Sequence, residues 1–94
     1  MIGLYYFNWA GTSEELKEYL GRVKEIANGI EGADLKGAFA PTSEWNCVLL
    51  IEATSFERIL DIYRTYRQKF GSNPNIPVGK LESLFTMQEL GNPP

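Results

Sequence analysis

The sequence contains no histidine and only one cysteine, and these two deficits exclude several kinds of site. Without an imidazole there is no Ser-His-Asp or Cys-His relay, no histidine-ligated zinc or haem, and no imidazole acid or base at neutral pH. A lone Cys47 also excludes an internal disulfide and a thiolate cluster. The remaining chemistry uses carboxylates, Tyr, Arg, Asn and Trp, and we expect neither a metal nor a cofactor.

Long apolar runs and a strong excess of one charge are also missing. The longest apolar runs, residues 1–7 and 47–51, are far shorter than the roughly 20 residues that cross a bilayer. Nine basic and twelve acidic residues give a net charge of −3, whereas binding to phosphate backbones usually requires a basic surface. We therefore expect a cytoplasmic protein with neither membrane nor nucleic acid among its partners, in keeping with the unpaired cysteine.

What is present suffices for one compact unit. A chain of 94 residues, 44% of them hydrophobic, buries roughly 60–65% of its unfolded surface, which allows a single core. One domain over residues 1–94 is the prediction. Alternating and continuous apolar segments predict strands at residues 2–9, 33–40, 45–53 and 80–90. A loop at residues 71–77 and a frayed tail at 91–94 follow from their Gly, Asn and Pro content.

Two helices are predicted from apolar residues spaced three and four apart. The first begins at the capping sequence Thr12-Ser13-Glu14-Glu15 and ends near Gly29 and Gly32. The second begins at Thr54-Ser55-Phe56-Glu57, which has the same capping pattern, and runs to about Phe70.

The element order strand, helix, strand, strand, helix, strand predicts an α+β, ferredoxin-like βαββαβ fold with a four-stranded antiparallel sheet. Its central strands, the first and the third, are continuously apolar over residues 4–7 and 48–51, although strands with one exposed face should alternate. Two helices cover only one face of such a sheet. We therefore expect a second copy of the chain to pack on the other face and form a homodimer.

The third strand and the residues after it carry the pattern Trp45-Asn46-x-Val48-x-Leu50-x-Glu52-Ala53 followed by a polar helix start. In this pattern, and in element order over nearly the whole chain, the sequence resembles the dimeric α+β barrel superfamily. The resemblance implies a homodimer whose two sheets form a barrel. The superfamily includes cofactor-free oxygenases, haem-degrading enzymes, lactone isomerases and stress-linked proteins, so it specifies a fold better than a reaction. Its haem-binding and His-Asp members match poorly, because this chain has no histidine.

The topology places the end of the first strand, the hairpin between the second and third strands, and the end of the second helix at one end of the molecule. The candidate catalytic residues there are Asn8, Tyr66 and Arg67. The candidate ligand-binding residues are Trp9, Trp45, Asn46 and Tyr63.

Each candidate has a structural alternative. By helical geometry Arg67 falls within the apolar stripe of the second helix, so its guanidinium either extends to solvent or a carboxylate, or binds an anionic or enolate oxygen of a ligand. Asn8 either ends its strand or orients a phenol, quinone or dioxygen, as the resemblance to cofactor-free oxygenases implies. Trp9 and Trp45 are either core or interface anchors, or the walls of a cavity.

Two further residues with reactive side chains lie in the predicted third strand. Glu52 is either a solvated strand end or, if buried without a cation, a general base for proton abstraction beside a carbonyl. Cys47, in an apolar strand, is expected to be an inert buried thiol.

The sequence thus predicts a small homodimeric protein that binds a small aromatic or anionic molecule in a cavity between sheet and helices. Two alternatives from different classes remain open at this point. One is a cofactor-free oxygenase or isomerase, and the other is a non-catalytic sensor or assembly subunit.

Overall fold

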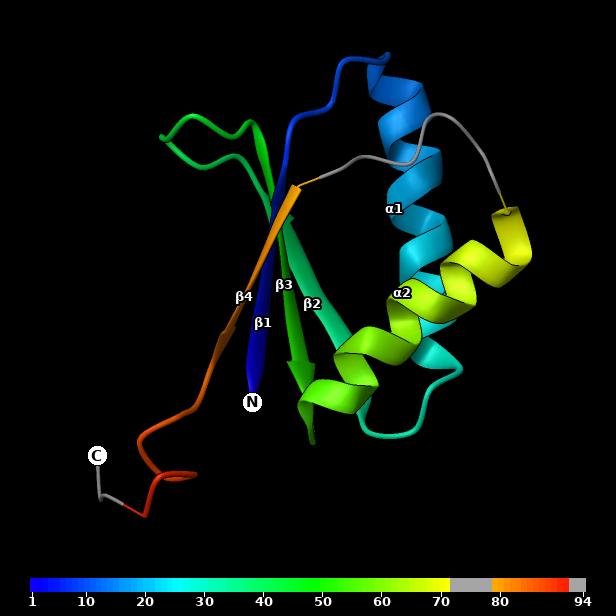
Figure 1. Cartoon of the computed structure of the whole chain (residues 1–94). Coiled ribbons are helices and arrows are strands. Elements are labelled where there is room, and N and C mark those ends of the chain that lie inside the picture. Colours follow the sequence, from blue (N-terminus) through cyan, green and yellow to red (C-terminus); the bar gives the residue numbers. More distant parts are fainter. Residues whose placement is uncertain (72–78, 92–94) are drawn as a thin grey trace.

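The computed structural model describes residues 1–71 and 79–91. Its elements, in chain order, are β1 (Ile2–Phe7), α1 (Ser13–Asn28), β2 (Ala33–Phe39), β3 (Cys47–Ala53), α2 (Phe56–Phe70) and β4 (Gly79–Leu84). The strands form one antiparallel sheet in the order β2-β3-β1-β4. The predicted ferredoxin-like α+β topology is confirmed, and both helices lie on the same side of the sheet (Figure 1).

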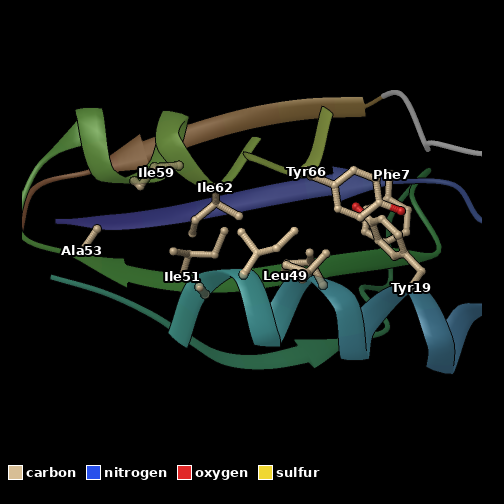
Figure 2. Packing of buried hydrophobic residues seen from close by; sticks show 11 residues of the cluster. Phe7, Tyr19, Leu49, Ile51, Ala53, Ile59, Ile62 and Tyr66 are labelled. Atoms are coloured by element: carbon tan, nitrogen blue, oxygen red, sulfur yellow. The ribbon is translucent and has the colours of Figure 1, made fainter. Parts of the chain in front are cut away.

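The hydrophobic core lies between this side of the sheet and the two helices. From α1 it takes one stripe spaced three and four residues apart, which includes Tyr19, Val23 and Ile26, and from α2 it takes Ile59, Ile62 and Tyr66. The sheet contributes alternate residues, among them Phe7, Leu49, Ile51 and Ala53 (Figure 2). The side chains of β1 and β3 that lie between these positions therefore point to the face opposite the helices.

The first predicted helix start is confirmed and the second is wrong in detail. At the start of α1 the Thr12 hydroxyl oxygen accepts a hydrogen bond from the Glu15 amide at 3.1 Å. At the start of α2 the N-cap is Ser55, without a side-chain cap bond, instead of Thr54. Thr54 belongs to the end of the sheet instead, where its backbone N–H donates to the Gly32 carbonyl at 2.8 Å next to the paired residues Ala33 and Ala53.

A β-bulge changes which face the second half of β2 presents. Leu35 pairs with Ile51 on the helix side, but the register shifts between Leu35 and Gly37, so Gly37 pairs with Leu50 and Phe39 with Val48. Leu35 and Phe39 therefore lie on opposite faces, although strict alternation along residues 33–40 would place them on one face. Phe39 lies on the face without helices and is 57% exposed.

The strands are shorter than predicted, and the last one is the clearest case. β4 ends at Leu84, not at residue 90, because Thr86 and Glu89 close a turn through reciprocal backbone-to-side-chain hydrogen bonds of 3.0 and 3.1 Å. Glu89 also accepts a 2.7 Å hydrogen bond from the N-terminal ammonium. This bond, together with the Thr86 amide, lowers the pKa of Glu89 to about 2.

Two sequence expectations cannot be compared in full with the structure. Most of the predicted loop at residues 71–77 and residues 92–94 of the tail lie outside the described residues. Within residues 1–71 and 79–91, neither helix combines the length and the apolar character that spanning a membrane requires.

Candidate functional site

Asparagine side chains join the end of β1 to the hairpin that precedes β3. The side-chain oxygen of Asn46 accepts from the Trp9 amide at 2.8 Å, and its side-chain nitrogen donates to the Trp9 carbonyl at 2.9 Å. In return, the side-chain oxygen of Asn8 accepts from the Asn46 amide at 2.8 Å. The structure thus brings Asn8, Trp9 and Asn46 together. The side-chain amides of the two asparagines, however, form hydrogen bonds with backbone groups.

We expect Asn46→Ala to lower the free energy of unfolding by about 1–3 kcal/mol, because two hydrogen bonds of about 0.5–1.5 kcal/mol each are lost. Asn28→Ala, at the exposed end of α1, is the matched control and should cost less than about 0.5 kcal/mol. Urea unfolding followed by circular dichroism measures both. Equal effects of the two substitutions would contradict a fastening role for Asn46.

Six aromatic rings form a continuous cluster at this end of the core, which we call the aromatic chain. Its members are Tyr5, Phe7, Trp9, Tyr19, Tyr66 and Phe70. Tyr19 is the centre, because it stacks on Trp9 at 5.5 Å and meets Phe7 and Tyr66 edge-on at 5.7 and 5.4 Å between ring centroids. Figure 2 shows the rings of Phe7, Tyr19 and Tyr66 gathered at one end of the buried cluster.

The aromatic chain connects two predicted site residues through Tyr19, which was not among the predicted site residues. Trp9 and Tyr66 both contact Tyr19, which is 7% exposed. Burial, with smaller effects of the neighbouring Tyr5, Tyr66 and Cys47, strongly raises the pKa of Tyr19, so this phenol stays protonated at neutral pH. Its position on the apolar stripe of α1 was visible in the sequence, but its central place among the rings was not.

Arg67 lies outside the aromatic chain, on the exposed flank of α2. The buried stripe of that helix consists of Ile59, Ile62 and Tyr66, so the prediction of Arg67 within the stripe is wrong. Its guanidinium lies 5.8 Å from the centroid of the Tyr63 ring and donates a long hydrogen bond of 3.4 Å to the Tyr63 hydroxyl. We call these two residues the Tyr63–Arg67 pair.

Arg67 differs from the other arginines of α2 in having, within the described ranges, no nearby carboxylate to balance its charge. Arg58 pairs with Asp61 at 3.0 Å, and Arg64 pairs with Glu57 at 3.0 Å. Among the residues that the structure describes, Arg67 has no carboxylate within ion-pair distance. It therefore combines an uncompensated positive charge with an exposed aromatic ring.

The Tyr63 phenol also affects the pKa of Tyr5 in β1. Burial, and secondarily the nearby Tyr63 phenol, raises the pKa of Tyr5. Tyr5 pairs across the sheet with Leu81 of β4, which is 36% exposed. Of the Tyr63–Arg67 pair, Tyr63 is therefore the member near Tyr5.

The remaining sequence candidates occupy other places. The Trp45 amide donates to the Ser43 hydroxyl at 3.4 Å, and no ring contact joins Trp45 to the aromatic chain in the described residues. Glu52 is exposed on the face without helices, with its carboxylate 4.0 Å from the Lys36 ammonium. Burial raises the pKa of the half-buried Cys47 thiol, so it remains protonated at neutral pH.

The described residues contain no group of three or more His, Cys, Asp or Glu placed to hold a metal ion. Comparison with known proteins found no match to a protein-family model, a curated protein or a solved structure.

Proposed function

We propose that this protein binds a small anionic molecule with an aromatic part, using the Tyr63–Arg67 pair, and that it acts as a homodimer. The observation that supports the proposal most is the charge of Arg67, which has no carboxylate partner in the described part of the chain, over the exposed ring of Tyr63. A guanidinium presents paired N–H donors that match a carboxylate or an enolate.

The ring of Tyr63 supplies the second half of the recognition. Its side chain is 52% exposed, so a planar ligand has access to it. An aromatic ring beside Tyr63 gains stacking energy while its anionic substituent bonds to Arg67. A ligand with both groups is therefore favoured over a purely aliphatic anion or a neutral ring.

The contacts support binding without catalysis better than they support an oxygenase or isomerase. Asn8 and Asn46 use their side-chain amides to hold backbone at the end of β1, and Tyr66 is buried within the aromatic chain. An oxygenase or isomerase needs such groups to reach the reacting atoms. Of the three predicted catalytic residues, Arg67 is the one whose side chain is exposed beside an accessible aromatic ring, that of Tyr63.

Substitution of Arg67 tests the binding site. We expect Arg67→Leu to weaken binding of 1-hydroxy-2-naphthoate roughly 10- to 100-fold, because a hydrogen bond to a charged group contributes about 1.5–3 kcal/mol. Stability should change by less than about 1 kcal/mol, since the residue is exposed. Titration followed by ligand fluorescence measures affinity, and urea unfolding measures stability.

Arg64→Leu is the matched control, because it removes the same charge from the same helix at a position paired with Glu57 and Asp61. It should leave the affinity within about twofold of wild type. The neutral probe 2-naphthol should bind weakly to all three proteins. Equal affinity of wild type and Arg67→Leu for 1-hydroxy-2-naphthoate would refute the site.

The homodimer is proposed from the face of the sheet opposite the helices. Strand alternation and pairing place on it a set of apolar side chains: Ile2, Leu4, Tyr6, Phe39, Val48, Leu50 and Leu84. We call this set the open face. Its margins carry both charges, with Asp34 and Lys36 on one edge strand and Lys80 and Glu82 on the other. Such a mixed margin suits contact with a second copy of the same face.

A further inference from the structure

β4 (Gly79–Leu84) is a regular strand at one end of the sheet order (Figure 1). It pairs with β1 in unbroken register from Gly79 to Leu84, and its other side carries outward-facing backbone groups. The opposite edge strand, β2, is interrupted by a bulge between Leu35 and Gly37, which hinders pairing with another strand. In the described residues, β4 has no bulge of this kind.

We infer that β4 pairs antiparallel with β4 of a second copy, about a two-fold axis at Leu81. This two-fold axis is perpendicular to the sheet and keeps each side chain on the same face in both copies. Residues directly opposite each other in an antiparallel pair also share a face. The axis must therefore pass between two copies of the same residue, and the choice of that residue sets the register. Centring on Lys80 places two ammonium groups opposite each other, and centring on Glu82 does the same for two carboxylates. Centring on Leu81 places each Lys80 opposite Glu82 of the other copy.

The side chains suit the register centred on Leu81 on both faces. Lys80 and Glu82 lie on the side of the open face, with side chains 61% and 40% exposed and 3.7 Å between their charged atoms. Both groups are thus available for a cross-strand ion pair. Leu81 points to the helix side, where it is 36% exposed and meets its own counterpart. Opposite-charge and apolar pairs directly across an antiparallel ladder stabilise it.

This contact shares Lys80 and Glu82 with the margin of the open face, but position 81 distinguishes it from the proposed contact through that face. Leu81 belongs to the side of the sheet that carries the helices, so two copies packed through their open faces do not bring their Leu81 side chains together. A cross-link at position 81 therefore reports edge pairing alone.

A disulfide at the two-fold axis provides the first test, in the full chain with Cys47→Ala. Directly opposed residues have Cα atoms about 4.5–5.5 Å apart, within the range of a disulfide. We expect Leu81→Cys to form a disulfide-linked dimer under mild oxidation. Ser83→Cys is the control, because position 83 lies about 14 Å from its counterpart in this register and should cross-link at most about a tenth as much. Equal cross-linking of the two variants, or none in Leu81→Cys, would overturn the inference.

Charge substitutions on the Leu81→Cys background provide the second test. Lys80→Glu places carboxylates against carboxylates, and Glu82→Lys places ammonium groups against ammonium groups, so each variant alone should lose most of its cross-linking. Mixed, the two variants restore opposite charges at both positions and should form the mixed disulfide dimer, which ion exchange separates by charge. Absence of this preference for the mixed dimer would refute the register, because an ion pair within one chain does not produce it.

Discussion

Replacement of Phe7 by alanine is expected to lower the free energy of unfolding by about 3–5 kcal/mol. Phe7 is fully buried at 0% exposure and lies 5.4 Å from Tyr5 and 5.7 Å from Tyr19 between ring centroids. The substitution removes a whole ring from the aromatic chain and leaves a cavity between the sheet and α1. Domains have a total stability of about 5–15 kcal/mol, so a large part of it is lost.

Phe85→Ala is the matched control for this prediction. The same ring is removed from a side chain that is 59% exposed, after the end of β4, and the expected loss is below about 1 kcal/mol. Urea unfolding of both variants and wild type at one protein concentration gives the comparison, because association would otherwise shift the apparent stability. A loss for Phe7→Ala no larger than that for Phe85→Ala would show that the aromatic chain is not part of the folded core.

Leu50→Lys is expected to break the proposed association through the open face, while pairing through β4 remains possible. Leu50 pairs with Leu4 on one side and with Gly37 on the other, so it lies in the middle of the open face. A lysine there places a charge without a partner inside the contact. We expect the dissociation constant to rise roughly 100-fold or more, which corresponds to about 3 kcal/mol. Sedimentation velocity over a range of protein concentrations measures it.

Phe56→Lys controls for the added charge. Phe56 is 40% exposed at the start of α2, on the other side of the sheet from the open face, and its substitution should leave the dimer intact. Circular dichroism should show a native fold for both variants, because neither side chain belongs to the buried core. A wild-type monomer at micromolar concentration, or a Leu50→Lys variant that associates to the same mass as wild type, would contradict association through the open face.

The sequence predicted those parts of the fold that depend on local spacing. The apolar stripe of α1 and its cap at Thr12 lie within one stretch of chain, so their pattern is visible without any tertiary contact. The convergence of Asn8, Trp9 and Asn46 also followed from the element order, because that order brings the end of β1 beside the hairpin before β3.

The predictions that failed involve a choice between local and distant partners. Thr54 has a local capping pattern, but its amide pairs with Gly32. The last strand was predicted too long, because Thr86 and Glu89 bond to each other and Glu89 bonds to the N-terminus. In both cases the backbone amide forms a hydrogen bond other than the one that the local sequence pattern predicts, either with a residue distant in the chain or within a closed turn.

The sequence by itself thus determined the α+β class, the element order and the exclusion of imidazole chemistry, since composition and periodicity are properties of the chain alone. Tertiary structure alone decided which candidate side chains face solvent and which stabilise the fold. The amides of Asn8 and Asn46 hold backbone, Tyr66 is packed against Tyr19, and Arg67 lies over Tyr63 outside the buried stripe. Helical spacing places a residue on a face to within one or two positions, but its burial depends on how the helix is rotated against the sheet, and only the packing of distant residues sets that rotation.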